Sequence, residues 1–185
     1  MYLKNMGESM YLEKINSPAD LKKLSLPEMK ALAGEMREAL FNRLTKIGGH
    51  FGPNFGMVEA TIALHYVFNS PVDKFVFDVS HQSYAHKLLT GRKAGYLDDA
   101  HFAEDSGYTN PDESEHDFFN VGHTSTSIAL AAGLAKGRDV LGGKENIIAV
   151  IGDGSLSGGE ALEALSVAGS ELNSNFIIIV NDNEI

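Results

Sequence analysis

Two uninterrupted apolar runs constrain the fold of this chain more than any other feature. Residues 147–151 read IIAVI and residues 176–180 read FIIIV, with no alternation of apolar and polar positions. Such runs are typical of strands in a parallel sheet that is covered on both faces. Residues 159–170 between them are predicted to be helical, and a strand-helix-strand crossover places its two strands side by side. We therefore expect an α/β fold, a parallel sheet with helices on both faces.

Capping signals and periodicity predict the other elements. Ser25, Pro27 and Glu28 form a capping box with proline in the first turn, which predicts a helix that runs to Gly48. The apolar content of residues 57–68 predicts a helix buried on nearly all sides. The remaining predicted elements are a strand at 75–79, a short helix that ends at Gly91, and a helix at 128–135.

Composition narrows the functional classes. The 185 residues are 43% hydrophobic, and the formal net charge of −10 comes without a cluster of Lys and Arg. We expect no nucleic-acid partner and no membrane partner, because both surfaces attract basic clusters. The lack of cysteine excludes disulfides and thiolate zinc sites, and no apolar run is long enough to span a bilayer. The default expectation is a cytoplasmic protein. Residues 98–117 hold eight acids and no Lys or Arg, which predicts a mobile or solvated loop.

An acid stands between two glycines where the first apolar run ends. Ligands of parallel sheets bind beyond the carboxyl ends of strands, where Gly152 and Gly154 would let the backbone approach a diphosphate. The carboxylate of Asp153 would repel that diphosphate unless a cation lay between them, so Asp153 predicts a metal. Asn183 follows the next strand, thirty residues later. Carboxylate, amide and diphosphate oxygens suit the octahedral shell of Mg²⁺.

Other interpretations of these residues stay open. The same turn is similar to the dinucleotide fingerprint G-x-G-x-x-G, although its third glycine position holds Ser157. A nicotinamide dinucleotide-binding dehydrogenase would then place Asp182 or Glu184 on the ribose. A Gly-Asp-Gly turn also occurs for purely structural reasons. His81 and His86 suggest zinc only weakly, because no Cys and no His-Glu-x-x-His motif accompanies them.

Several motifs together resemble one known family. The GDG and NDN segments are similar to the thiamine diphosphate motif of the transketolase superfamily. Further matches narrow the resemblance to the N-terminal section of the 1-deoxy-D-xylulose-5-phosphate synthase family. In order along the chain they are GHF at 49–51, DVSHQSYAHK at 78–87, LTGR at 89–92, ESE at 113–115 and GHTSTSI at 122–128.

The resemblance implies a role for each matching position. Asp153 and Asn183 would ligate Mg²⁺ through their side chains, and Ile185 through its carbonyl. His50 would transfer a proton near the substrate. The residues implied to contact thiamine diphosphate are His81, Gly122, His123, Thr124, Gly154, Ser155 and Asn183.

The resemblance also implies a reaction and an assembly. Members of the family condense pyruvate with glyceraldehyde 3-phosphate and release CO₂. This reaction serves isoprenoid and thiamine biosynthesis, and the enzymes are homodimers. Residues 1–185 would be a truncated diphosphate-binding domain. The pyrimidine-binding and C-terminal domains would be absent, so we expect the chain alone to be inactive.

Departures from the family pattern leave alternatives. Ser80 stands where the family usually has glycine and Thr124 where serine is common, and residues 108–112 lack the basic residues usual just before the ESE segment. A transketolase-like enzyme with another acceptor sugar and a non-catalytic subunit therefore remain open alongside the dehydrogenase.

Overall fold

The computed structural model describes residues 11–182, which form two compact units. Unit 1 contains residues 11–69 and Tyr84–Asp105, and unit 2 contains Ser70–Ser83 and residues 106–182. Within this part of the chain, no helix is both long enough and apolar enough to cross a membrane.

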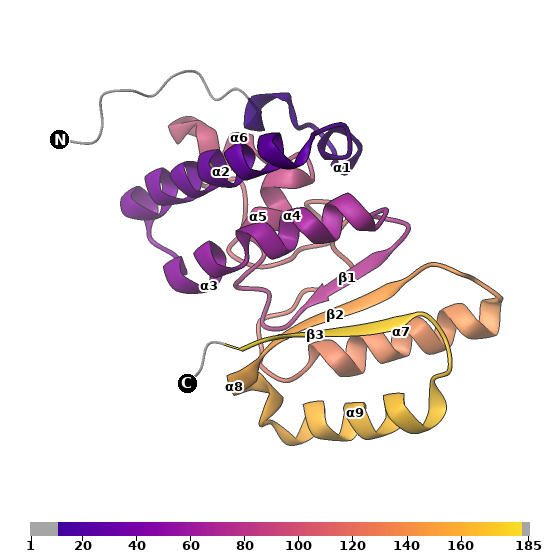
Figure 1. Ribbon diagram of the computed structural model, residues 1–185. Helices are drawn as coiled ribbons and strands as arrows, with labels where there is room; N and C mark the ends of the chain where they lie inside the picture. The colour runs from indigo at the N-terminus through magenta and orange to yellow at the C-terminus, as the bar shows by residue number, and fades with distance from the viewer. Residues whose placement is uncertain (1–10, 183–185) are drawn as a thin grey trace. The chain divides into compact units, whose positions relative to one another are not determined.

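Unit 2 is built on a parallel three-stranded sheet in the order β1-β2-β3 (Figure 1). The strands are β1 (Lys74–Phe77), β2 (Ile147–Gly152) and β3 (Phe176–Asn181). All three predicted strands are thus confirmed, with ends shifted by one or two residues. The helices of unit 2 are α7 (Ser127–Leu141), α8 (Asp153–Leu156) and α9 (Gly159–Glu171).

The core of unit 2 lies between the sheet and helices α7 and α9, which run along the same side of the sheet (Figure 1). Ile147, Ala149 and Ile151 of β2 face Ile128 and Ala131 of α7 there, all fully buried. Each large aliphatic side chain buried in this way contributes about 1.5–3 kcal/mol.

Strand β3 is less buried than β2, and the predicted end of one helix of unit 2 is wrong. Strand β2 is buried on both faces, whereas none of the residues of β3 is fully buried. Strand β3 pairs only with β2 among the described residues, so an apolar run alone did not reveal how far the strand is covered. Helix α7 also continues past its predicted end at Ala135 to Leu141, because Gly142 with φ 75° forms its left-handed C-cap.

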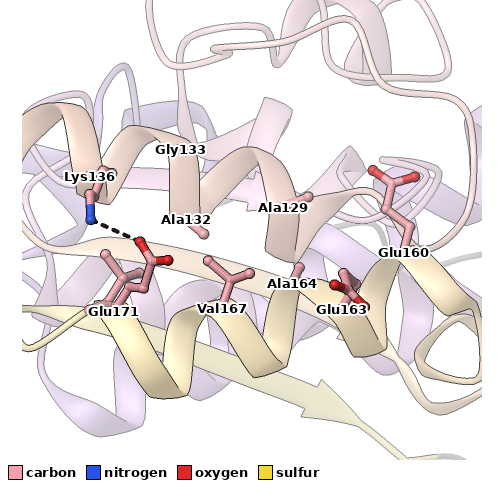
Figure 2. A pocket seen from close by; sticks show the side chains of 10 residues that line it. Ala129, Ala132, Gly133, Lys136, Glu160, Glu163, Ala164, Val167 and Glu171 are labelled. Atoms are coloured by element: carbon pink, nitrogen blue, oxygen red, sulfur yellow. Dashed lines mark hydrogen bonds and ion pairs between the residues drawn. The ribbon is translucent and has the colours of Figure 1, made fainter.

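A groove of 470 Å³ runs between α7 and α9. Small side chains, including Ala129, Ala132 and Ala164, line it, and the Lys136–Glu171 ion pair spans it (Figure 2). Glu160 and Glu163 stand at its rim.

Unit 1 is helical. Its long helix α2 (Leu26–Ile47) begins as predicted, since both the backbone N–H and the hydroxyl of Ser25 donate to Glu28 at 2.7 Å. The other elements are η1 (Leu12–Lys14), α1 (Pro18–Leu21), α3 (Phe51–Gly56), α4 (Val58–Val67), α5 (Tyr84–Leu89), α6 (Ala94–Leu97) and η2 (Asp99–His101).

Helix α4 is not buried on all sides, as its composition had predicted. Ile62 and His65 are buried, but Tyr66 is 42% exposed and Val67 is 65% exposed. The ring of His65 stacks on the ring of His86, with 2.9 Å between the Nε2 of His65 and the Nδ1 of His86. The helix therefore has an apolar outer face.

The acidic stretch 98–117 is only partly solvated, which corrects the prediction of a solvated loop. Thr109 and Asp117 are buried. The Asp117 carboxylate accepts from the N–H of Asn110 at 2.8 Å, and the Thr109 hydroxyl donates to the Phe119 carbonyl at 2.9 Å. Local polar contacts thus fix the second half of this stretch.

Candidate functional site

The sheet register brings the ends of β2 and β3 together. Gly152 is the register partner of Asn181, so Asp153 follows one strand and Asp182 follows its neighbour at the same edge. This arrangement is what the crossover spacing predicted. Asn183 and Ile185 lie outside the described residues, and their expected roles as ligands stay predictions.

The turn after β2 leaves room beside its backbone. Asp153 opens the short helix α8 and is half-buried, and Gly154 is exposed. A Cβ placed on Gly154 would meet nothing within 4 Å. Packing among the described residues therefore does not require glycine there, and the open space is available to a ligand.

The loop before α7 consists of exposed residues followed by a buried anchor. Gly122, His123 and Thr124 are exposed, and a Cβ on Gly122 would also meet nothing within 4 Å. Ser125 is only 8% exposed and has φ 70°, a left-handed conformation that is rare for a residue other than glycine. Its hydroxyl donates to the Ser155 carbonyl at 2.7 Å. The loop and the turn after β2 are therefore in direct contact.

A buried acid at the end of β1 holds the same loop. The carboxylate of Asp78, 1% exposed, accepts from the N–H of Ser125 and from the N–H of Ser127, both at 3.0 Å. These donors belong to the start of α7, where unpaired N–H groups and the helix dipole favour a negative charge.

The backbone is strained directly after Asp78. Val79 and Ser80 have φ values of 56° and 64°. Ser80 is fully buried; its hydroxyl donates to the Val121 carbonyl and accepts from the N–H of Thr109, both at 2.9 Å. Strained residues of this kind persist only where their surroundings hold them, and they are frequent at functional sites.

The histidines predicted for the site lie in both units. In unit 2, His81 is half-buried beyond the end of β1, and the Nδ1 of exposed His123 is 3.1 Å from the Thr124 carbonyl. In unit 1, exposed His50 precedes α3, and its carbonyl accepts from the Asn54 amide at 2.8 Å.

The described residues supply only part of a metal shell. Across residues 11–182, no group of three or more His, Cys, Asp or Glu is arranged to hold a metal ion. The predicted Mg²⁺ set instead joins one carboxylate, that of Asp153, to an amide and a carbonyl from residues 183–185. Oxygen donors of these types are the ones that Mg²⁺ prefers.

Comparison with known proteins decides the family. A family model described as 1-deoxy-D-xylulose-5-phosphate synthase matches residues 12–185. The chain belongs to this family. The resemblance inferred from the motifs is thereby confirmed.

Individual relatives agree with this assignment. The 1-deoxy-D-xylulose-5-phosphate synthase of Dictyoglomus thermophilum is 53% identical over 175 residues, which cover 95% of this chain and 28% of that protein. The synthase of Dehalococcoides mccartyi strain CBDB1 is 52% identical over 181 residues, with 98% and 28% covered. The chain thus spans little more than a quarter of the length of these relatives.

A solved structure confirms the fold class. Transketolase from Leishmania mexicana superposes with a TM-score of 0.67 at 22% identity, covering 85% of this chain and 28% of that one. This likeness shows a transketolase-like α/β fold.

In this member of the 1-deoxy-D-xylulose-5-phosphate synthase family, sequence reasoning missed two polar residues at the site. Asp78 and Ser125 lie within the matching motifs, but neither received a role. Asp78 follows an apolar strand in the same way as Asp153 does, and this position at a strand end was the signal that could have identified it.

Proposed function

We propose that this chain is the diphosphate-binding part of an enzyme that uses thiamine diphosphate and Mg²⁺. The enzyme condenses pyruvate with glyceraldehyde 3-phosphate, releases CO₂ and forms 1-deoxy-D-xylulose 5-phosphate. Family membership supports this proposal. The structural observation that carries it is the pairing of Gly152 with Asn181, because this register brings the Asp153 turn to the end of β3.

The residues at this edge fit a bound diphosphate. Gly122 and Gly154 are exposed and have open space where a side chain would be. The N–H groups of residues 122–124 precede a 15-residue helix, whose N-terminus attracts anions. A carboxylate next to such an anion requires a cation, and Asp153 supplies one oxygen for it.

Each residue has a distinct task in the proposed enzyme. Asp153 and Asn183 hold Mg²⁺ through side-chain oxygens, and Ile185 does so through its carbonyl. Gly154 and Ser155 face the diphosphate. When bound, thiamine diphosphate supplies the carbon nucleophile and accepts the electron pair that loss of CO₂ releases.

The loop before α7 and three histidines carry the remaining proposed roles. Gly122, His123 and Thr124 donate hydrogen bonds to the cofactor, and His81 contacts it beyond the end of β1. His50 moves a proton at the substrate, which an imidazole can do near neutral pH.

The proposal extends to the whole protein. Relatives are more than three times as long as this chain, so the proposed active enzyme contains further domains and the 185 residues alone do not turn over substrate. The proposed enzyme is a cytoplasmic homodimer.

Isothermal calorimetry tests the cofactor assignment. Thiamine diphosphate is titrated into the protein that carries this chain, with Mg²⁺ and then with EDTA. We expect binding that EDTA abolishes. The variant Asp153→Asn should bind at least tenfold more weakly and lose turnover, because a neutral amide is a poorer ligand for a hard cation. Glu163→Gln, which removes one exposed negative charge on α9, should match the wild type.

The titration also separates the proposal from its alternatives. NADH binding that does not require metal would contradict it and support a dehydrogenase. Metal-dependent thiamine diphosphate binding, combined with turnover of another acceptor sugar, would overturn only the substrate assignment.

A further inference from the structure

Asp78 is a buried acid, and each of its two carboxylate oxygens accepts a hydrogen bond. Its side chain lies at the end of β1, and it accepts from the N–H groups of Ser125 and Ser127 at 3.0 Å each. A buried carboxylate is tolerated only when it is hydrogen-bonded. Its partners lie 47 and 49 residues later in the chain, so the contact fastens the loop before α7 to the end of a strand.

Ser125 also links the loop before α7 to the turn after β2. Its N–H donates to Asp78, while its hydroxyl donates to the carbonyl of Ser155 in the turn after β2 at 2.7 Å. The contact is close enough that a Cβ on Gly158 would fall 2.0 Å from the Ser125 hydroxyl oxygen. Ser125 makes both bonds from a left-handed backbone conformation, with φ 70°.

The segments that this connection fastens are those with an exposed, open side. Gly122, His123 and Thr124 directly precede the anchor, and exposed Gly154 is the neighbour of Ser155. The buried hydrogen bonds of Ser125 therefore connect these two exposed segments.

We propose that Asp78 is a positioning residue that assembles the two halves of the diphosphate site before the cofactor binds. This inference rests on the proposed function. The carboxylate sets the position of residues 122–124 through the Ser125 and Ser127 amides. Through the Ser125 hydroxyl it sets their distance from the turn at residues 153–155. Asp78 itself touches neither the cofactor nor the metal.

The substitution Asp78→Asn tests this role, because it preserves size but turns one acceptor oxygen into an NH₂ group that faces an N–H donor. A matched control exists at the opposite end of the same strands. Asp73 is 5% exposed, and its Oδ1 accepts from the backbone N–H and the side-chain amide of Asn146 at 2.7 and 2.9 Å. Asp73→Asn therefore makes the same chemical change away from the site.

Both variants are made in the protein that carries this chain, and thermal stability is measured together with Mg²⁺-dependent binding of thiamine diphosphate. We expect both to lower the melting temperature. Only Asp78→Asn should raise the Kd for thiamine diphosphate by tenfold or more. Its KM for thiamine diphosphate should rise to the same extent, while kcat at saturating cofactor stays within threefold of the wild type.

The outcomes separate this inference from the proposed function. Equal Kd values for the two variants would overturn the role of Asp78 and leave the cofactor assignment intact. Failure of the wild type to bind thiamine diphosphate would overturn both. If Asp78→Asn does not fold, Ser125→Ala takes its place, because it removes only the hydrogen bond to Ser155. We expect its Kd to rise at least threefold, and an unchanged Kd would refute the inference.

Discussion

Ser80, just beyond the carboxyl end of β1, combines a strained backbone with two buried hydrogen bonds. Ser80 holds φ 64° although it is not glycine, and its buried hydroxyl joins Val121 to Thr109. The left-handed conformation costs a non-glycine residue roughly 1–2 kcal/mol. Leaving the buried Thr109 N–H without its acceptor would cost about 1–3 kcal/mol. The hydrogen bonds therefore explain why serine is tolerated in this left-handed conformation.

Two substitutions of Ser80 separate strain from hydrogen bonding. Ser80→Ala removes both bonds and keeps the strain, whereas Ser80→Gly removes both bonds and relieves the strain. We expect both to be less stable than the wild type, with Ala below Gly by about 1 kcal/mol. Urea denaturation measures the difference. A glycine variant more stable than the wild type would show that the strain outweighs the bonds.

At the scale of elements, a buried arginine of α7 joins the amino ends of β2 and β3. Arg138 is 4% exposed, and its Nη1 donates to the carbonyls of Glu145 and Asn175 at 2.6 and 2.7 Å. Its Nη2 donates to the Ser174 hydroxyl. These hydrogen bonds lie at the end of the strands opposite the candidate site, so Arg138 supports the sheet without touching that site.

Loss of the hydrogen bonds that Arg138 donates should destabilise unit 2 strongly. Arg138→Met removes the guanidinium donor from the Glu145 and Asn175 carbonyls and leaves the Asn175 carbonyl with the Ile147 N–H, and we expect a loss of about 3 kcal/mol or more. Lys136→Met, two residues away, breaks only the exposed ion pair with Glu171 and should cost about 0–1 kcal/mol. Denaturant unfolding compares them. Equal losses would contradict a structural role for Arg138.

The capping box of α2 should contribute to the dependence of stability on pH. Hydrogen bonds from the Ser25 hydroxyl and the Ser25 N–H lower the pKa of Glu28 below its ordinary value of 4.5. Because the pKa is lower in the folded state, the contribution is fully present above pH 4.5 and is lost as the pH falls through the folded pKa. Glu28→Gln should lack this part of the acid dependence. Melting curves at pH 3 to 7 test it, and parallel curves for the two proteins would contradict it.

The sequence predicted some elements well because local signals decided them. The capping box marked the start of α2, and the apolar runs marked β2 and β3. Helix α3 was missed because Gly52, Pro53 and Gly56 disfavour a helix locally. The exposure of β3 depends on how the strands pair, which no local pattern encodes.

The candidate site depends on the order and register of the parallel strands more than on any single sequence motif. The position of Asp153 directly after β2 was predictable because the apolar run ends there, and its role as a metal ligand stays a prediction. The neighbouring position of the β3 end followed from the crossover rule and is confirmed by the register. The anchoring of the loop by Asp78 was not predictable, because it joins residues 47 positions apart.

The most direct test of this account is the position of a bound cation. Crystals of the protein that carries this chain, grown with thiamine diphosphate and Mn²⁺ in place of Mg²⁺, would locate the metal by its anomalous scattering. We expect one peak about 2 Å from a carboxylate oxygen of Asp153, with the Asn183 amide and the diphosphate in the same shell. Bound thiamine diphosphate with no metal at Asp153, or a peak at the other end of the sheet, would contradict the account.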